Sequence, residues 1–169
     1  AARADEPPAT RTVGVVTLER CPAAAPDGWC GSIERPLDAS GTVQGTIRIG
    51  FEWYEHDPRV ASAGTLVAVQ GGPGFGTTWG RDTFRTILDV TTFDRDLLLF
   101  DARGTGTSEA IDCPDAQQAR PFESEATAAC AARLGERAGL YGTVAAADDL
   151  AALLDALAVS RVDYYGPSY

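Results

Sequence analysis

Positions 162–169 read VDYYGPSY, a short run that leads directly into Gly166, Pro167 and Ser168. Valine and tyrosine favour strands, and the Gly-Pro pair predicts that the strand ends in a tight turn. A serine there fits the first three positions of Gly-x-Ser-x-Gly, in which a strand turns sharply and a serine hydroxyl projects over the sheet. The stretch therefore predicts a reactive serine at a strand end. The alternative is a surface serine in an ordinary Gly-Pro turn.

Two upstream runs, TLVAVQ (65–70) and DLLLFD (96–101), are short and almost continuously apolar. Such runs are typical of strands in a parallel sheet that helices cover on both faces. A short helix is expected between them, at 79–90. A longer one is expected from Thr143, as its capping residue, to about Val159. Its apolar stripe consists of Leu150, Leu153, Leu154 and Leu157.

Residues 32–57 show the alternation of an antiparallel hairpin that turns at Gly41. The apolar residues that alternate with polar or small ones are Ile47, Ile49, Phe51 and Trp53. Residues 1–31 are expected to form an amino-terminal arm and a disulfide loop, and 32–169 the core. The order of elements predicts an α/β fold, a mostly parallel sheet with an antiparallel hairpin at its start that ends at the turn of Ser168.

A glycine-rich loop, QGGPGFG, follows the first apolar run at 70–76. Gly71, Gly72 and Gly74 let backbone amides approach a small ligand, and Pro73 stiffens the loop, so its N–H groups are suited to an oxyanion. A phosphate cradle is the rival, but the Gly-Lys-Ser/Thr of a P-loop and the Gly-x-Gly-x-x-Gly pattern are both absent. A simple tight turn is the remaining alternative.

A second glycine-rich turn, DARGTGTS, follows the other apolar run at 101–108. Asp101 and Arg103 are candidates for a catalytic pair, but a buried arginine that a carboxylate holds to brace a loop is the interpretation we favour. Gly104 is assigned the same supporting role. Ser108 is expected to bond the local backbone.

The four cysteines form two pairs close in sequence, Cys21 with Cys30 and Cys113 with Cys130. This is the simplest of three pairings, and disulfides would indicate an exported protein. Zinc is the alternative, but the Cys-x-x-Cys spacing is absent and the chain has 1 histidine. No metal is therefore expected. Buried free thiols remain the other possibility.

The net charge of -10 argues against a nucleic-acid partner, because phosphate binding needs a surplus of cations. The sequence has no apolar run near the length of a membrane span. Its single histidine, His56, is expected to be exposed at the end of the hairpin, although a serine nucleophile requires a base.

In this order and spacing, GGPG, DARGTGTS and YGPSY resemble the α/β-hydrolase fold, and within it the serine peptidases of the proline iminopeptidase and tripeptidyl aminopeptidase family. The resemblance covers about residues 32 to 169 and is greatest to the secreted actinobacterial branch. It implies Ser168 as nucleophile, with the Gly72 and Tyr169 amides as oxyanion hole. Gln70 departs from the histidine that the family often has, and we expect altered loop bonding there with the chemistry retained.

The family's catalytic order is Ser, then Asp, then His, so His56 does not correspond to its base. The resemblance therefore implies a partner, the carboxyl-terminal remainder of the same hydrolase as a second polypeptide or segment that supplies the acid and the base. It implies a secreted aminopeptidase that cleaves short units from peptide amino termini through an acyl-enzyme on Ser168, without a cofactor. The alternatives are an esterase or amidase acting on a small metabolite, and a non-catalytic binding protein on a decayed hydrolase scaffold.

Overall fold

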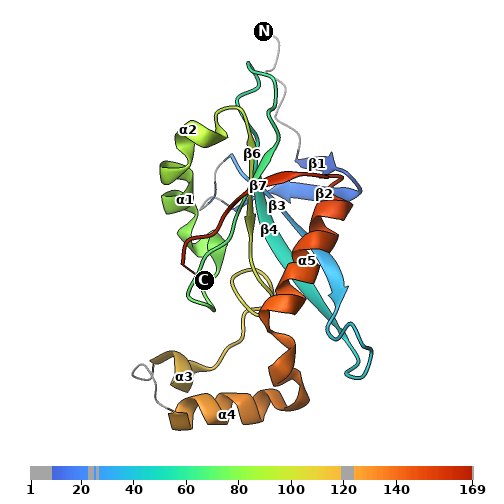
Figure 1. The fold of residues 1–169 in the computed structure, drawn as a ribbon, viewed down its shortest axis with the longest axis vertical. Helices are drawn as coiled ribbons and strands as arrows, with labels where there is room; N and C mark the ends of the chain where they lie inside the picture. Colours follow the sequence, from blue (N-terminus) through green and yellow to red (C-terminus); the bar gives the residue numbers. More distant parts are fainter. Residues whose placement is uncertain (1–8, 23–24, 26, 119–123, 169) are drawn as a thin grey trace.

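The computed structural model describes residues 9–22, 25, 27–118 and 124–168. Its centre is a mixed sheet of 7 strands in the order β1-β2-β3-β4-β6-β5-β7, with helices on both faces (Figure 1). This is an α/β arrangement, as the sequence predicts. The prediction of a mostly parallel sheet is wrong, because β1 to β4 form an antiparallel meander and β4 also pairs antiparallel with β6, so four of the six strand pairs are antiparallel.

Four strands form the antiparallel half of the sheet. They are β1 (Thr10–Val13), β2 (Val16–Arg20), β3 (Trp29–Pro36) and β4 (Thr46–Tyr54). β3 and β4 pair over eight residues, with Ile33 opposite Ile49 and Trp29 opposite Trp53. β1 and β2 lie within residues 1–31, for which the sequence predicts an amino-terminal arm and a disulfide loop. Their signal is weak because Val16 and Leu18 alone are buried in β2 and none of β1 is buried.

Three strands form the parallel half, β5 (Thr65–Ala68), β6 (Asp96–Phe100) and β7 (Val162–Tyr165). β5 pairs in parallel with β6 on one side and β7 on the other, and β6 pairs antiparallel with β4. All of β5 and most of β6 are buried, which explains their continuous apolar runs. The carboxyl ends of the three strands therefore meet at one edge of the sheet.

Helices pack on the two faces of this parallel half (Figure 1). The helical elements are η1 (Thr77–Gly80), α1 (Arg81–Ile87), α2 (Asp89–Thr92), α3 (Pro114–Gln118), α4 (Ser124–Leu134), η2 (Gly135–Leu140) and α5 (Thr143–Ala156). On one face, Phe84 and Leu88 share a cluster with Leu66 and Leu99. On the other, α5 packs against the sheet. None of the helices in the described part of the chain is long and apolar enough to cross a membrane.

The leucine stripe of α5 faces the core as predicted. Leu153 and Leu157 are fully buried against Val67 and Leu98, and Leu150 and Leu154 pack at the border of this cluster. Several helix boundaries differ from the prediction, and α5 ends at Ala156 in place of about Val159. Gly142 occupies the capping position in place of Thr143, and the helix predicted at 79–90 is broken at Leu88 between α1 and α2.

Both predicted disulfides are present. Cys21–Cys30 has a Cα–Cα separation of 4.9 Å and Cys113–Cys130 one of 5.8 Å. The first ties the residue after β2 to β3, and the second joins the residue before α3 to α4. Helices α3 and α4 extend away from the sheet (Figure 1). Two disulfides within one chain are typical of extracellular proteins.

Candidate active site

The three glycine-rich segments follow three parallel strands, so they meet at one edge of the sheet. Val69 donates its N–H to the Tyr165 carbonyl at 3.1 Å, which extends the pairing of β5 with β7. The loop that begins at Gln70 and the turn that contains Ser168 therefore leave the sheet side by side. Figure 1 shows the end of the described chain near the loop after β5. Open α/β sheets place their ligand sites at this edge.

Ser168 lies in a left-handed backbone conformation, with φ of 69°. Residues other than glycine adopt this conformation with a steric penalty, and such residues cluster at active sites. The Ser168 side chain is exposed. Tyr169, whose amide was predicted to complete the oxyanion hole, lies outside the described residues.

Gly72 has φ of 128°, which again favours glycine. A Cβ at this position would lie 2.5 Å from a ring carbon of Phe75, so the ring packs directly on the glycine. Among the described residues, the Gly72 N–H donates no hydrogen bond to a backbone carbonyl. The neighbouring Gly71 N–H donates to Gln70 Oε1 at 3.2 Å. The Gln70 side chain therefore accepts the N–H of Gly71, the residue before Gly72, and leaves the Gly72 N–H free.

The rest of this loop is held by its own backbone and by η1. The peptide between Gly72 and Pro73 is cis, and Gly74 has φ of 101° with open space around it. Gln70 donates its N–H to Thr77 Oγ1 at 2.9 Å, which fixes the start of the loop to η1.

Asp101 is completely buried and joins this loop to the one after β6. Its carboxylate accepts hydrogen bonds from the N–H and hydroxyl of Thr78, at 2.9 and 2.7 Å. It also accepts from the N–H and hydroxyl of Thr107, at 2.6 and 2.8 Å. With four donors on one carboxylate, Asp101 acts as a brace between two loops.

Arg103 does not pair with Asp101. Its guanidinium forms a bidentate pair with Asp149 of α5, at 2.7 and 2.8 Å, and donates to the carbonyls of Leu37 and Leu140 at 2.8 and 2.9 Å. Gly104, with φ of 77°, lies against the Tyr141 ring. The loop after β6 is therefore fixed to the helix on the far face of the sheet. Asp149 was not predicted as a functional residue, because its only signal in the sequence is a carboxylate within the apolar stripe of a helix.

Ser108 forms hydrogen bonds with the local backbone, as expected. Its hydroxyl donates to the Asp101 carbonyl at 2.7 Å and accepts from the Gly50 N–H at 2.8 Å, and the side chain is fully buried. A substrate therefore has no access to it.

His56 lies near the amino-terminal end of β6, whereas Ser168 follows the carboxyl end of β7. Tyr54 is opposite Leu97 in the antiparallel pair, so the residue after β4 is level with the start of β6. There His56 Nδ1 lies 2.7 Å from Asp96 Oδ1, and the same oxygen accepts the His56 N–H at 2.9 Å. The prediction of an exposed histidine is wrong, because Asp96 holds the ring half-buried. From Leu97, which is opposite Tyr54, β6 continues for three more residues to its carboxyl end at Phe100. Three strand residues span about 10 Å, so at least this distance separates His56 from the carboxyl ends of the parallel strands.

A hollow of about 950 Å³ also lies at this end of the sheet, between the end of β4 and helices α1 and α2. Tyr54, Asp57 and Arg85 are among its lining residues, whereas none of the predicted catalytic residues lines it. The candidate site therefore consists of the loop after β5 and the turn that contains Ser168, which follow paired ends of β5 and β7.

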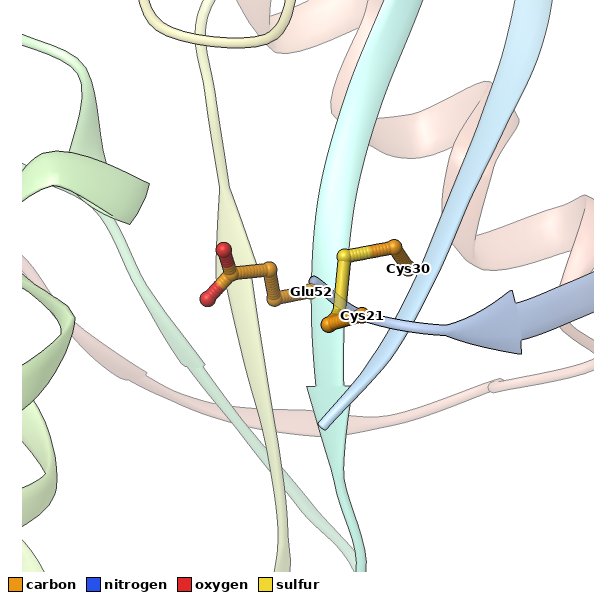
Figure 2. Close-up of side chains that lie close together, drawn as sticks. All are labelled: Cys21, Cys30 and Glu52. Atoms are coloured by element: carbon orange, nitrogen blue, oxygen red, sulfur yellow. A yellow bond between two sulfur atoms is a disulfide. The ribbon is translucent and has the colours of Figure 1, made fainter. Parts of the chain in front are cut away.

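Cys21, Cys30 and Glu52 bring two sulfurs and a carboxylate within 4.8 Å of one another (Figure 2). The cysteines share a disulfide, so neither offers a thiolate. The Glu52 carboxylate already accepts hydrogen bonds from Arg81, the shortest at 2.7 Å, and from the Tyr54 hydroxyl at 2.7 Å. This cluster is therefore a structural connection between β3, β4 and α1.

No protein-family profile and no curated protein matches the sequence. Among solved structures, the chain is similar to a proline iminopeptidase-related protein from Thermus thermophilus, with 20% identity and a TM-score of 0.42. The match covers 80% of this chain and 35% of that protein, so the chain spans about a third of the length of the protein it resembles.

Proposed function

We propose that this chain carries the nucleophile of a serine hydrolase with the α/β-hydrolase fold, and that Ser168 is that nucleophile. The observation that carries the proposal is the left-handed conformation of Ser168 shortly after the strand β7 ends. A nucleophile elbow requires this kind of strained strand-to-turn junction. The free N–H of Gly72 on the neighbouring loop supports the same function.

In the proposed reaction, Ser168 Oγ attacks the substrate carbonyl carbon, and the carbonyl oxygen takes up negative charge. The Gly72 N–H donates to this oxyanion, together with the Tyr169 N–H. A base takes the serine proton and gives it to the leaving group, and water then hydrolyses the acyl-enzyme. Asp101 and Arg103 take no part in these steps, and they hold the two loops in place.

The proposed base and acid come from a carboxyl-terminal segment of the same hydrolase, on a second polypeptide or as a further segment. Two observations support this. His56, the histidine of this chain, is hydrogen-bonded to Asp96 at the amino-terminal end of β6, whereas Ser168 follows the carboxyl end of β7. The outer edge of β7 pairs with no other strand of the described ranges, so it is open to one more strand.

The proposed substrate is a peptide cleaved at its amino terminus, and the proposed location is outside the cell. The resemblance of the three glycine-rich motifs to the proline iminopeptidase and tripeptidyl aminopeptidase family implies a peptidase rather than an esterase, and the two disulfides favour export.

The test is labelling with a fluorophosphonate probe in the full protein together with everything that co-purifies with this chain. Ser168 should be modified, and Ser168→Ala should abolish labelling. Ser160→Ala changes an exposed serine of the loop before β7 and is the matched control, which should label normally. Labelling that persists in Ser168→Ala would show that another serine is the nucleophile, and absence of labelling in the wild type would favour the non-catalytic binding protein.

A further inference from the structure

We infer that Phe75 and Trp79 form an apolar subsite for the side chain of the substrate residue whose carbonyl Ser168 attacks. The inference rests on the proposed function and adds a substrate class to it, an aliphatic or aromatic residue at the amino terminus.

Both rings are exposed although they lie on a loop with buried neighbours. Phe75 is 61% exposed and Trp79 is 62% exposed, whereas Thr77 and Thr78 between them are buried. The other tryptophans, Trp29 and Trp53, are 2% and 3% exposed. Two large rings exposed within five residues of each other form an apolar surface of the kind that marks a binding site.

The two rings lie against two glycines of the loop that carries the candidate oxyanion donor. Phe75 packs on Gly72, since a Cβ on that glycine would lie 2.5 Å from the ring. Trp79 lies beside Gly76, where a Cβ would be 3.2 Å from the indole and 2.6 Å from Gly106. Phe75 therefore contacts the glycine whose N–H is the candidate donor, and Trp79 lies at the other end of the same loop, between Gly76 and η1.

The loop offers a substrate side chain no charge and no free hydroxyl. Residues 70–80 contain no charged side chain. The Thr77 hydroxyl accepts from the Gln70 N–H, and the Thr78 hydroxyl donates to Asp101. Arg81, the first charged residue after the loop, is paired with Glu52. What remains is aromatic surface, backbone N–H and the neutral Gln70 amide, none of which carries a charge, so the loop favours apolar groups over acidic or basic ones.

The test has a binding arm and a catalytic arm, both in the full protein. In the binding arm, Ser168→Ala is titrated with leucine amide, phenylalanine amide and glycine amide while tryptophan emission is recorded. Trp79 is the exposed tryptophan, so the two apolar amides should shift the emission to the blue and glycine amide should not. The shift should disappear when Trp79→Phe is added.

In the catalytic arm, kcat/KM is measured for leucyl, phenylalanyl and glycyl p-nitroanilides. Phe75→Ala and Trp79→Ala should lower the preference for the apolar substrates over the glycyl one by about tenfold. Phe75→Leu, which keeps an apolar side chain, should retain most of the leucyl preference. Val90→Ala removes an exposed apolar side chain on α2 and should leave the preference unchanged.

The outcomes separate this inference from the proposed function. If Ser168 reacts with the fluorophosphonate but neither ring variant alters the preference, the subsite is wrong and the hydrolase proposal stands. If Ser168 does not react, the hydrolase proposal is wrong and the binding arm alone decides. A blue shift specific to apolar amides then still supports the subsite, and its absence overturns it.

Discussion

Arg103 and Asp149 form a buried bidentate ion pair between the loop after β6 and the helix α5, 46 residues apart in sequence. Asp149 is 0% exposed and also accepts a hydrogen bond from Arg35 of β3, at 3.3 Å. One carboxylate thus connects three elements on this face of the sheet. The loop that it fixes contains Asp101, which in turn holds η1 next to the Gly72 loop.

Asp149→Ala should lower the free energy of unfolding by about 3–5 kcal/mol, because it leaves the buried guanidinium of Arg103 without its partner. The measurement is urea unfolding of the full protein. Asp148→Ala changes the exposed neighbour on the same helix and is the control. Equal losses in the two variants would contradict a special role for the buried pair.

Thr78→Val should destabilise the protein by about 1.5–3 kcal/mol, because the buried Asp101 carboxylate loses a hydroxyl donor at 2.7 Å and valine keeps the shape. Thr83→Val, at an exposed position of α1, should change stability far less. Chemical denaturation measures both. If the brace positions the Gly72 loop, Thr78→Val should also slow the reaction of Ser168 with the probe, and an unchanged rate would argue against that connection.

Each disulfide should contribute about 3 kcal/mol, because it restricts the unfolded chain over separations of 9 and 17 residues. Replacing either cysteine pair by two alanines should lower the stability accordingly. Non-reducing peptide mapping should recover both linked pairs. Four free thiols in that map would contradict the pairing and remove the main support for export.

Local patterns predicted much of this fold. Continuous apolar runs identified β5 and β6 because both faces of those strands are covered, and the spacing of four leucines identified the buried face of α5. Close spacing in sequence gave the disulfide pairs. In each case the relevant interaction is either local or an average over a whole face.

Interactions between distant residues were not predictable in the same way. Asp96 lies 40 residues from the histidine that it holds half-buried, and nothing near His56 in the sequence indicates it. The pairing of Arg103 with Asp149 in place of Asp101 depends on how α5 lies on the sheet. At the candidate site the sequence supplied the serine and the glycines, but backbone angles and free amides follow from the packed structure.

Asp38 should make the stability depend on pH below about 4. The Val43 N–H, followed by the Ser40 hydroxyl and N–H, holds the pKa of Asp38 at about 2, from an ordinary value of 3.8. Because the folded pKa is the lower one, the ionised form favours the folded state. This contribution is complete above about pH 4 and is lost as the pH falls toward 2. The difference in melting temperature between wild type and Asp38→Asn should therefore close over that interval, and a difference that persists at pH 2 would contradict the assignment.

The left-handed conformation of Ser168 predicts opposite effects of glycine at two serines in the same region. At Ser168, φ of 69° penalises any residue with a Cβ, so Ser168→Gly should be more stable than Ser168→Ala by about 1 kcal/mol. Ser160, on the loop before β7, has no positive φ, so Ser160→Gly should instead be less stable than Ser160→Ala, by about 0.4–1 kcal/mol. The measurement is chemical denaturation of all four variants of the full protein. Both Ser168 variants lack the serine hydroxyl, so the comparison reports on the backbone alone. If alanine were the more stable substitution at Ser168 as well, the turn would be unstrained, and the observation that carries the proposed nucleophile would be lost.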